Sequence, residues 1–504
     1  MSIVVALFIL LSPYVFRNGF VNGIITTYDN ATSNATNAVA APQPMQGWTV
    51  APAGRGTLGI LWSSGFTMFL CSWSILFLNV PGPNDTRFQV FRRKLYMTTL
   101  SFLGPEFIFQ IALGQWISAW HSVREFQSYI SAWNSDRERG VPEYMWTMEH
   151  AFFADMGGIV LLAKGEKTPF PIDAKQLHYL VTRGHLKFPK LDKRAIADKN
   201  KVNGALRVIT LFQILWFVIN LCGRVAQQLT ITCVELTTAA FIVCSLGTLF
   251  CWAQKPSDVT VSEELKSKNT LAEILGERIH DPYRQTPLDF ISRREWPWSI
   301  YWSNWINILR NLGIVFAPPK KPVDQFENTI ARELPGATVW MFLSVTAAYS
   351  AVFISGWNYS FPTRIEQVLW RAASITMMGC LIAYWAITEF AFSAYPKIKK
   401  YVSTLVGSHK RERDLEQSTR FPMWPGHEHM VRSAQYVAAC IRNNTVDQDR
   451  ALDVPLKAIL PMYVVGFFYC CARTYLFVAD VIELRSLPAS AYLTVDWTIY
   501  FPHF

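Results

Sequence analysis

Residues 458–482 read AILPMYVVGFFYCCARTYLFVADVI, an apolar stretch that nevertheless contains Arg473 and Asp480. About 20 apolar residues in a helix are enough to cross the hydrocarbon core of a bilayer. The sequence therefore predicts an all-α fold, a multi-pass transmembrane helical bundle of about seven spans. The six other stretches of suitable length are residues 57–80, 95–120, 207–223, 229–252, 337–357 and 365–392.

The composition agrees with a membrane protein. Hydrophobic residues make up 51% of the chain and charged residues only 17%, which is unusual for a soluble globular protein. The net charge of +10 comes mainly from segments between the apolar stretches, as expected for loops beside anionic lipid. We therefore expect the lipid bilayer of an endomembrane or the plasma membrane as a partner, and no nucleic acid.

The N-terminal segment lies outside the predicted bundle. Residues 1–20 resemble a secretory signal peptide or membrane anchor, although a positive n-region and a clear cleavage site are missing. Residues 21–56 are predicted to form a disordered lumenal tail, with glycosylation sequons at Asn30 and Asn34. A third sequon, at Asn358, falls in a short loop that is lumenal in the topologies considered.

The rest of the chain alternates between apolar and basic regions. Each predicted pair of apolar helices is followed by a long polar segment, which we expect to form helical cytosolic loops. The predicted divisions are the first two transmembrane helices (57–120), a basic loop region (121–206), a transmembrane hairpin (207–252), a loop (253–335), a second hairpin (336–395), a basic loop (396–457), and the last transmembrane helix with the C-terminal tail (458–504).

The charge distribution conflicts with seven simple crossings. Residues 164–201 hold ten basic and four acidic residues, and residues 397–457 hold eleven and seven, so both segments should be cytosolic. A lumenal N-terminus followed by seven alternating spans would place them in the lumen. An eighth span or re-entrant segment at residues 144–163 would remove the conflict, as would a cytosolic N-terminus. Glu149 and Asp155 favour instead an amphipathic helix lying on the membrane.

A tryptophan-rich segment in the second long loop carries a separate membrane signal. Trp298, Trp302 and Trp305 recur at helical spacing behind Pro297. This pattern predicts an interfacial amphipathic helix whose indole rings lie at headgroup depth. The alternative is a helix packed against the transmembrane bundle.

Five ionisable residues interrupt or border the apolar stretches. A charge at mid-helix costs ~2.5–3.5 kcal/mol on insertion, so such residues usually face a bundle interior or an aqueous cavity. We interpret them as pathway or polar-core groups, the alternative being inter-helix salt bridges and interfacial anchors. They are Glu106, Glu235, Glu389, Arg473 and Asp480.

Three local features of these residues matter for their roles. Arg473 and Asp480 are seven residues apart, which places them on one face of the last span. Pro105 should break the hydrogen-bond ladder beside Glu106. Glu235 has no basic residue closer in the sequence than Arg224, which predicts a buried carboxylate without a local partner.

Motifs of known membrane enzymes and of metal sites are not found. The sequence has no Walker loop, no GxSxG and no HxxxH histidine-box set. His427 and His429 form an HxH pair that a metal could use, but two ligands do not make a site, and surface histidines are the favoured interpretation. We predict no cofactor.

Several local strings of the chain are distinctive. They are RGTLGILWS at 55–63, CSWSILFLNVP at 71–81, RRKL at 92–95, HAFFADMGG at 150–158, DKNK at 198–201, WAQKPSDV at 252–259 and RSLPASAYLTVDWTIYFPHF at 485–504. Together they resemble a family of uncharacterised filamentous-fungal multi-pass membrane proteins. The resemblance covers nearly the whole chain and implies a membrane topology and a fungal source, but no activity. One departure is the LNV at 78–80, which lacks the preceding histidine common in that family.

Three functions from different classes fit these observations. The favoured one is a transporter or channel-like protein for a small solute, ion or proton, with the five ionisable residues as pathway groups. The first alternative is an intramembrane enzyme acting on a lipidic or terpenoid substrate, with Glu106 or Glu235 as general acid. The second alternative is a membrane receptor or scaffold.

Overall fold

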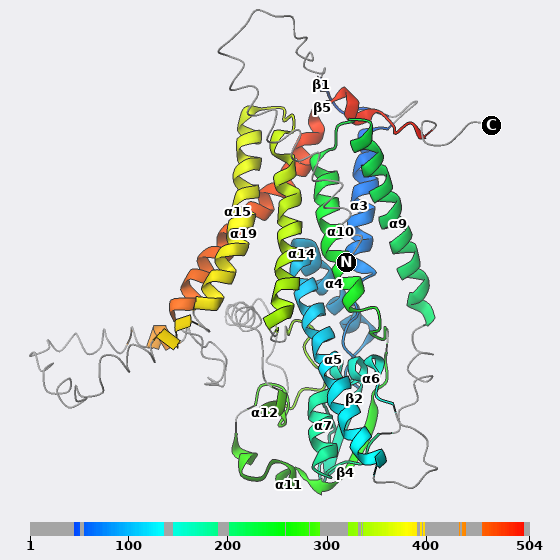
Figure 1. Ribbon diagram of the computed structural model, residues 1–504, viewed down its shortest axis with the longest axis vertical. Coiled ribbons are helices and arrows are strands. Elements are labelled where there is room, and N and C mark those ends of the chain that lie inside the picture. Colours follow the sequence, from blue (N-terminus) through cyan, green and yellow to red (C-terminus); the bar gives the residue numbers. More distant parts are fainter. Residues whose placement is uncertain are drawn as a thin grey trace, which may run out of the picture.

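The computed structural model is mostly helical, and its longest helices form an elongated bundle (Figure 1). The structure describes residues 45–50, 55–135, 145–189, 201–257, 259–281, 283–292, 321–330, 336–390 and 456–497, with a few isolated positions elsewhere. The bundle helices are α3 (Thr57–Trp73), α4 (Arg87–Leu103), α5 (Pro105–Ser135), α9 (Lys201–Ala226), α10 (Cys233–Cys251), α14 (Gly336–Ser355), α15 (Arg364–Glu389) and α19 (Leu456–Ile482).

Five helices among the described residues are long and apolar enough to cross a membrane. They belong to α9, α10, α14, α15 and α19. Their ends follow local sequence signals: α10 begins at a capping box in which Thr232 and Glu235 bond each other's backbone N–H, and Thr363 accepts a hydrogen bond at the start of α15. The predicted helical membrane bundle is thus supported in its coarse form.

The prediction that residues 95–120 form one transmembrane helix is wrong, because this segment folds back on itself. α4 and α5 form a hairpin with Gly104 as the single residue between them. Pro105 has no N–H to donate within α4 but suits the first position of a helix, so the chain can end α4 and begin α5 there. Pro105, which was predicted to break the hydrogen-bond ladder of one span, thus marks a reversal of the chain direction.

The tip of this hairpin reaches the middle of the neighbouring helices. The Phe102 ring lies 5.5 Å from that of Phe241, halfway along α10, and 5.3 Å from that of Phe477 in α19. Ten residues after the tip, Gln115 accepts a hydrogen bond from Trp252, just beyond the C-terminal end of α10 (3.0 Å). Ten helical residues rise about 15 Å, which is half the ~30 Å of a hydrocarbon core.

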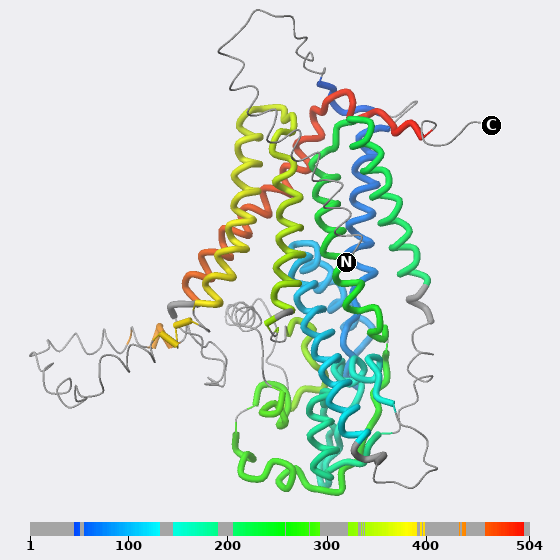
Figure 2. The backbone as a smooth tube through the Cα atoms, viewed as in Figure 1, coloured from blue at the N-terminus to red at the C-terminus, as the bar shows by residue number. Residues whose placement is uncertain are grey.

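The hairpin explains how the long connections leave from one end of the bundle. α3, α10 and α15 run toward the end where the α/β part lies, and α9, α14 and α19 run back (Figure 1). The short β1 (Met45–Gln46) and β5 (Leu487–Pro488) pair at the opposite end, which brings the described ends of the chain together (Figure 2).

A small α/β part packs below the bundle and corrects two predictions. Strand β2 (Ile159–Lys164) pairs antiparallel with β3 (Phe170–Pro171) and parallel with β4 (Glu263–Thr270), so the fold is not purely helical. Residues 144–163, predicted as a span, re-entrant segment or surface helix, instead supply the buried α6 (Met148–Asp155) and β2. The remaining elements are α7 (Ala174–Thr182), α11 (Leu271–Leu275), α12 (Asp289–Ser292), η2 (Gly276–His280), η3 (Gly356–Asn358), η6 (Glu483–Arg485) and η7 (Ala489–Tyr492).

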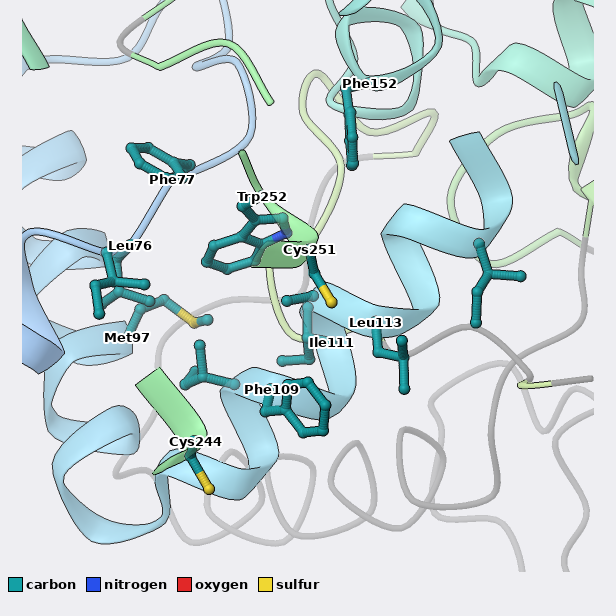
Figure 3. Packing of buried hydrophobic residues seen from close by; sticks show 14 of the residues in the cluster. Leu76, Phe77, Met97, Phe109, Ile111, Leu113, Phe152, Cys244, Cys251 and Trp252 are labelled. Atoms are coloured by element: carbon teal, nitrogen blue, oxygen red, sulfur yellow. The ribbon is translucent and has the colours of Figure 1, made fainter. Parts of the chain in front are cut away.

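The apolar core continues from the bundle into the α/β part. Side chains of α5 pack between the end of α10 and the segment after α3, where Phe109, Ile111, Trp252 and Phe77 lie close together (Figure 3). Phe109 also contacts α10 closely enough that a Cβ on Gly247 would lie 2.7 Å from its ring. This packing fixes the depth at which α5 and its N-terminal Glu106 sit.

Candidate functional site

Glu106 lies at the tip of the hairpin, in the first turn of α5, and is buried. Its Oε1 accepts a hydrogen bond from the hydroxyl of Tyr469 in α19. One turn further along α19, the Arg473 Nε donates to the carbonyl of Leu103, the last residue of α4 (3.1 Å). Both helices of the hairpin are therefore tied to α19 at mid-bundle.

The guanidinium of Arg473 is 2% exposed and lies among aromatic rings. Its Cζ is 4.4, 5.1, 5.5 and 5.7 Å from the ring centroids of Phe477, Phe241, Phe353 and Tyr349. A desolvated cation over ring faces gains up to about 2 kcal/mol. Within the described part of the chain, Nη1 and Nη2 have no hydrogen-bond partner. A buried polar group without a partner costs about 1–3 kcal/mol, so these donors suit a polar ligand or water.

Asp480 and Gln110 extend this polar interior on either side of Arg473. The Thr237 hydroxyl of α10 donates to Asp480 Oδ1 (2.9 Å). The other oxygen of Asp480, and the Nε2 of Gln110 one turn beyond Glu106, find no hydrogen-bond partner among the described residues. Arg473 interacts electrostatically with both Glu106 and Asp480. The structure thus brings three of the predicted pathway residues into one buried cluster.

Glu235 lies apart from this cluster, in the first turn of α10 at the end where β1 and β5 pair. Its carboxylate pairs with Arg55, and the Nε of Arg224 is 4.0 Å from Oε1. The prediction of a buried Glu235 carboxylate without a partner is therefore wrong. The sequence could not reveal its partner Arg55, which is 180 residues away. Nearby, the buried Glu483 accepts a hydrogen bond from the backbone N–H of Cys233 (2.6 Å).

Glu389 does not belong to the polar interior. It is the last residue of α15 and is exposed, at the end of the bundle opposite Glu235. Its position at a helix terminus explains why an apolar stretch tolerates it. Asn358 is exposed in the turn after α14, where its Oδ1 accepts from Arg371 (3.4 Å).

Several predicted sites fall outside the described residues, and the structure says nothing about them. Across the part of the chain that is described, no group of three or more His, Cys, Asp or Glu could hold a metal ion. The sites outside are the sequons Asn30 and Asn34, the predicted interfacial Trp298, Trp302 and Trp305, and the histidines His427 and His429.

Lys255 is a buried charge that the sequence interpretation missed. It is 0% exposed, just after α10, and its Nζ donates to the Phe77 carbonyl (2.8 Å) and to Gln115 Oε1 (2.9 Å). Burial lowers the pKa of Lys255 to about 7. The nearby Asp155 carboxylate acts to raise this pKa, and the positive charge of Arg207 acts to lower it further. The amine joins α5, α10 and the segment after α3 at the junction with the α/β part.

Other missed residues had weak or no sequence signals. Glu483 follows Asp480 by three residues, so the spacing that linked Arg473 and Asp480 also places it on that face. Tyr349 and Tyr469 lie inside apolar stretches, where a tyrosine is unremarkable. Arg55 precedes its helix and gave no indication of a distant partner.

Residues 30–275 match the family model described as a family of unknown function (DUF8562). The matched region contains the α4–α5 hairpin, Glu106 and Glu235, but not α14, α15 or α19. No curated protein and no solved structure matches the chain. The match agrees with the resemblance to an uncharacterised family and supplies no activity, so the fungal source stays a prediction.

Proposed function

We propose that this protein is an integral membrane transporter or channel-like protein for a small solute, ion or proton. The observation that carries the proposal is the half-depth hairpin, because α5 begins at mid-bundle beside the buried Glu106, Arg473 and Asp480. Half-length helices that end at mid-membrane are typical of transporter sites, where free backbone groups and helix dipoles bind charged solutes.

We further infer a multi-pass arrangement in which six helices cross the bilayer and the hairpin enters and leaves from one side. The sixth helix is α3, whose 17 residues rise about 25 Å. This arrangement puts all three long basic loops on the same side, and the positive-inside rule assigns that side to the cytosol. Asn358 and the C-terminal tail then face the lumen or the outside. No crossing at residues 144–163 is needed.

The enzyme alternative has less support from the site. An acid catalyst for a lipidic or terpenoid substrate needs an apolar pocket whose aromatic rings shield a cationic intermediate. Here the rings surround Arg473, a positive charge of the protein itself. Glu235, the other candidate acid, is paired with Arg55. A receptor or scaffold would need no solute site, and the experiment below separates it from a transporter.

The test begins with the purified protein in detergent. A panel of amino acids, organic acids, sugars and salts is screened for a rise in unfolding temperature, since a solute at 100 times its Kd stabilises the folded state by about 2.7 kcal/mol. Each stabilising compound is then followed as radiolabelled uptake into proteoliposomes. We expect Glu106→Gln to reduce uptake at least tenfold, and the exposed Glu389→Gln to leave it unchanged.

Two results would contradict the proposed function. One is uptake in Glu106→Gln equal to that of the wild-type protein. The other is a wild-type protein that is stabilised by none of the compounds and moves neither solutes nor ions across the vesicle membrane. The second result would favour the receptor or scaffold.

A further inference from the structure

A line of buried ionisable side chains runs from the hairpin tip to one end of the bundle. Tyr469, Arg473 and Asp480 follow one another on α19, and Glu483 begins η6 directly after the end of α19. Seven helical residues separate Arg473 from Asp480, about 10 Å along the axis, and one turn separates Asp480 from Glu483. Arg473, Asp480 and Glu483 are each 2–3% exposed.

Each member of the line interacts with the next. Glu106 accepts a hydrogen bond from the Tyr469 hydroxyl and interacts electrostatically with Arg473. Arg473 in turn interacts with Asp480, and Asp480 with Glu483. The line continues to a less buried end, because Glu483 interacts with Glu235, whose partner Arg55 has an 18% exposed side chain.

On the side of Glu106 that leads along α5 toward the α/β part, the polar side chains are of another kind. The next polar side chains along α5 are Gln110 and Gln115, amides that do not titrate, and the next titratable group is Lys255, which Gln115 contacts. Among the described residues, no carboxylate lies on α5 between Glu106 and Gln115, and the buried Asp155 that acts on Lys255 belongs to the α/β part. This asymmetry resembles a half-path that opens to one side of the membrane and ends at its middle.

We propose that the carboxylates of Glu483, Asp480 and Glu106 carry protons between the end of the bundle at Arg55 and Glu235 and its middle. The proposal rests on the proposed function and names the proton as the transported or coupling ion. Chains of Asp and Glu inside transmembrane bundles commonly serve as proton relays. A proton needs no open pore, which agrees with the burial of these groups.

The transfer is a sequence of proton exchanges without redox chemistry. The O–H bond of a protonated Glu483 breaks as an O–H bond forms on Asp480, and water relays the proton past Arg473 to Glu106. Arg473 remains a guanidinium throughout, because arginine keeps its proton in proteins. The unpaired Asp480 Oδ2 and Arg473 Nη atoms are the polar atoms that such a water would contact.

The experiment uses the full chain in proteoliposomes that contain a pH-sensitive dye. A potassium gradient with valinomycin makes the interior negative, and acidification is followed with and without the solute found in the screen. We expect Asp480→Asn and Glu483→Gln to slow acidification at least tenfold. Each amide keeps an oxygen for the hydrogen bond from Thr237 or from the Cys233 N–H, but it cannot bind and release a proton.

Two controls separate proton transfer from a structural role. Asp480→Glu retains a titrating carboxyl group and should keep a measurable acidification rate. If Asp480 were only structural, Asp480→Glu and Asp480→Asn would acidify at similar rates. Glu389→Gln changes an exposed carboxylate outside the line and should acidify at the wild-type rate. Folding of every variant is checked by its unfolding temperature before reconstitution.

The outcomes of the two proposals are distinguishable. Wild-type acidification in both Asp480→Asn and Glu483→Gln would overturn the proton inference. Solute uptake by the wild-type protein without any proton movement would also overturn it and leave the proposed function standing. If neither solute nor protons move, both proposals fail.

Discussion

Arg473 balances two buried carboxylates, Glu106 and Asp480, within a shell of aromatic rings. Removing one partner from a buried set of charges leaves the others uncompensated and costs about 3–5 kcal/mol. We expect Arg473→Gln to lower the free energy of unfolding by that amount. Chemical unfolding in detergent micelles measures the loss.

Arg485, in η6 just after the end of α19, provides a matched control. Its side chain is 53% exposed and pairs with Glu366, and exposed ion pairs contribute about 0–1 kcal/mol. Arg485→Gln should therefore destabilise the protein by less than about 1 kcal/mol. Equal losses in the two variants would show that Arg473 does not act as the central counter-charge.

Lys255 should make stability depend on pH. Its pKa is lowered from 10.5 to about 7 by burial, so between these values the unfolded chain binds one proton more than the folded protein. The free energy of unfolding should rise with pH in that window, by up to about 1.4 kcal/mol per pH unit. Below pH 7 both states hold the proton, and the contribution no longer changes. Urea unfolding at several pH values from 6 to 10 tests this.

The comparison of two lysine variants isolates the effect of burial. Lys255→Met removes the titrating amine and should flatten the slope. Lys266→Met removes a lysine whose side chain is 77% exposed and should leave the pH slope of the unfolding free energy as in the wild-type protein. The same slope in Lys255→Met and the wild-type protein would mean that Lys255 does not titrate near neutrality.

At the scale of elements, the α4–α5 hairpin depends on the absence of a side chain at Gly104. A Cβ there would lie 2.6 Å from the Phe107 ring and 3.1 Å from the Tyr469 hydroxyl, which bonds Glu106. Overpacking of this kind costs about 1–3 kcal/mol. We expect Gly104→Ala to destabilise the protein by that amount and to weaken any activity that depends on Glu106, as measured by thermal unfolding and uptake.

Gly379 in the middle of α15 supplies the control for this substitution. A Cβ at Gly379 would meet nothing within 4 Å, and alanine favours a helix over glycine by about 1 kcal/mol. Gly379→Ala should leave stability unchanged or raise it. A Gly104→Ala variant as stable as the wild-type protein would argue against the tight hairpin tip.

The sequence predicted most of the helices but not how the segment 95–120 turns. Hydropathy reports where apolar residues lie. The end of α4 and the start of α5 form one apolar run, residues 95–120, with the length of a span, so this run alone cannot reveal a reversal. The charge distribution did indicate that seven simple crossings with a lumenal N-terminus were inconsistent, and a re-entrant segment was one of the solutions it left open. The predictions for residues 144–163, a span, a re-entrant segment or a surface helix, were wrong because the apolar residues of this segment fill the core of the α/β part.

At the scale of the whole molecule, the site depends on contacts between distant parts of the chain. Glu106 and Tyr469 are 363 residues apart, and Arg55 and Glu235 are 180 residues apart. Lone charges in apolar stretches identified Glu106, Arg473 and Asp480 as candidates, because burial of charge is costly wherever it occurs. Which of them meet is set by helix packing, which a single sequence does not encode locally.

The last prediction concerns the topology of the whole chain. It tests whether residues 57–120 cross the membrane twice or cross once and then form a hairpin. With two crossings at residues 57–120, positions 84 and 187 lie on opposite sides of the membrane, whereas the hairpin places both on the same side and position 360 on the other. All three positions are exposed, so Asn84→Cys, Lys187→Cys and Ser360→Cys can be introduced singly after the native cysteines are replaced. A membrane-impermeant maleimide applied to intact cells should label position 360 only, and positions 84 and 187 should react together once the membrane is opened. Labelling of position 84 and position 187 from opposite sides would contradict the hairpin, and with it the half-depth site on which both proposals rest.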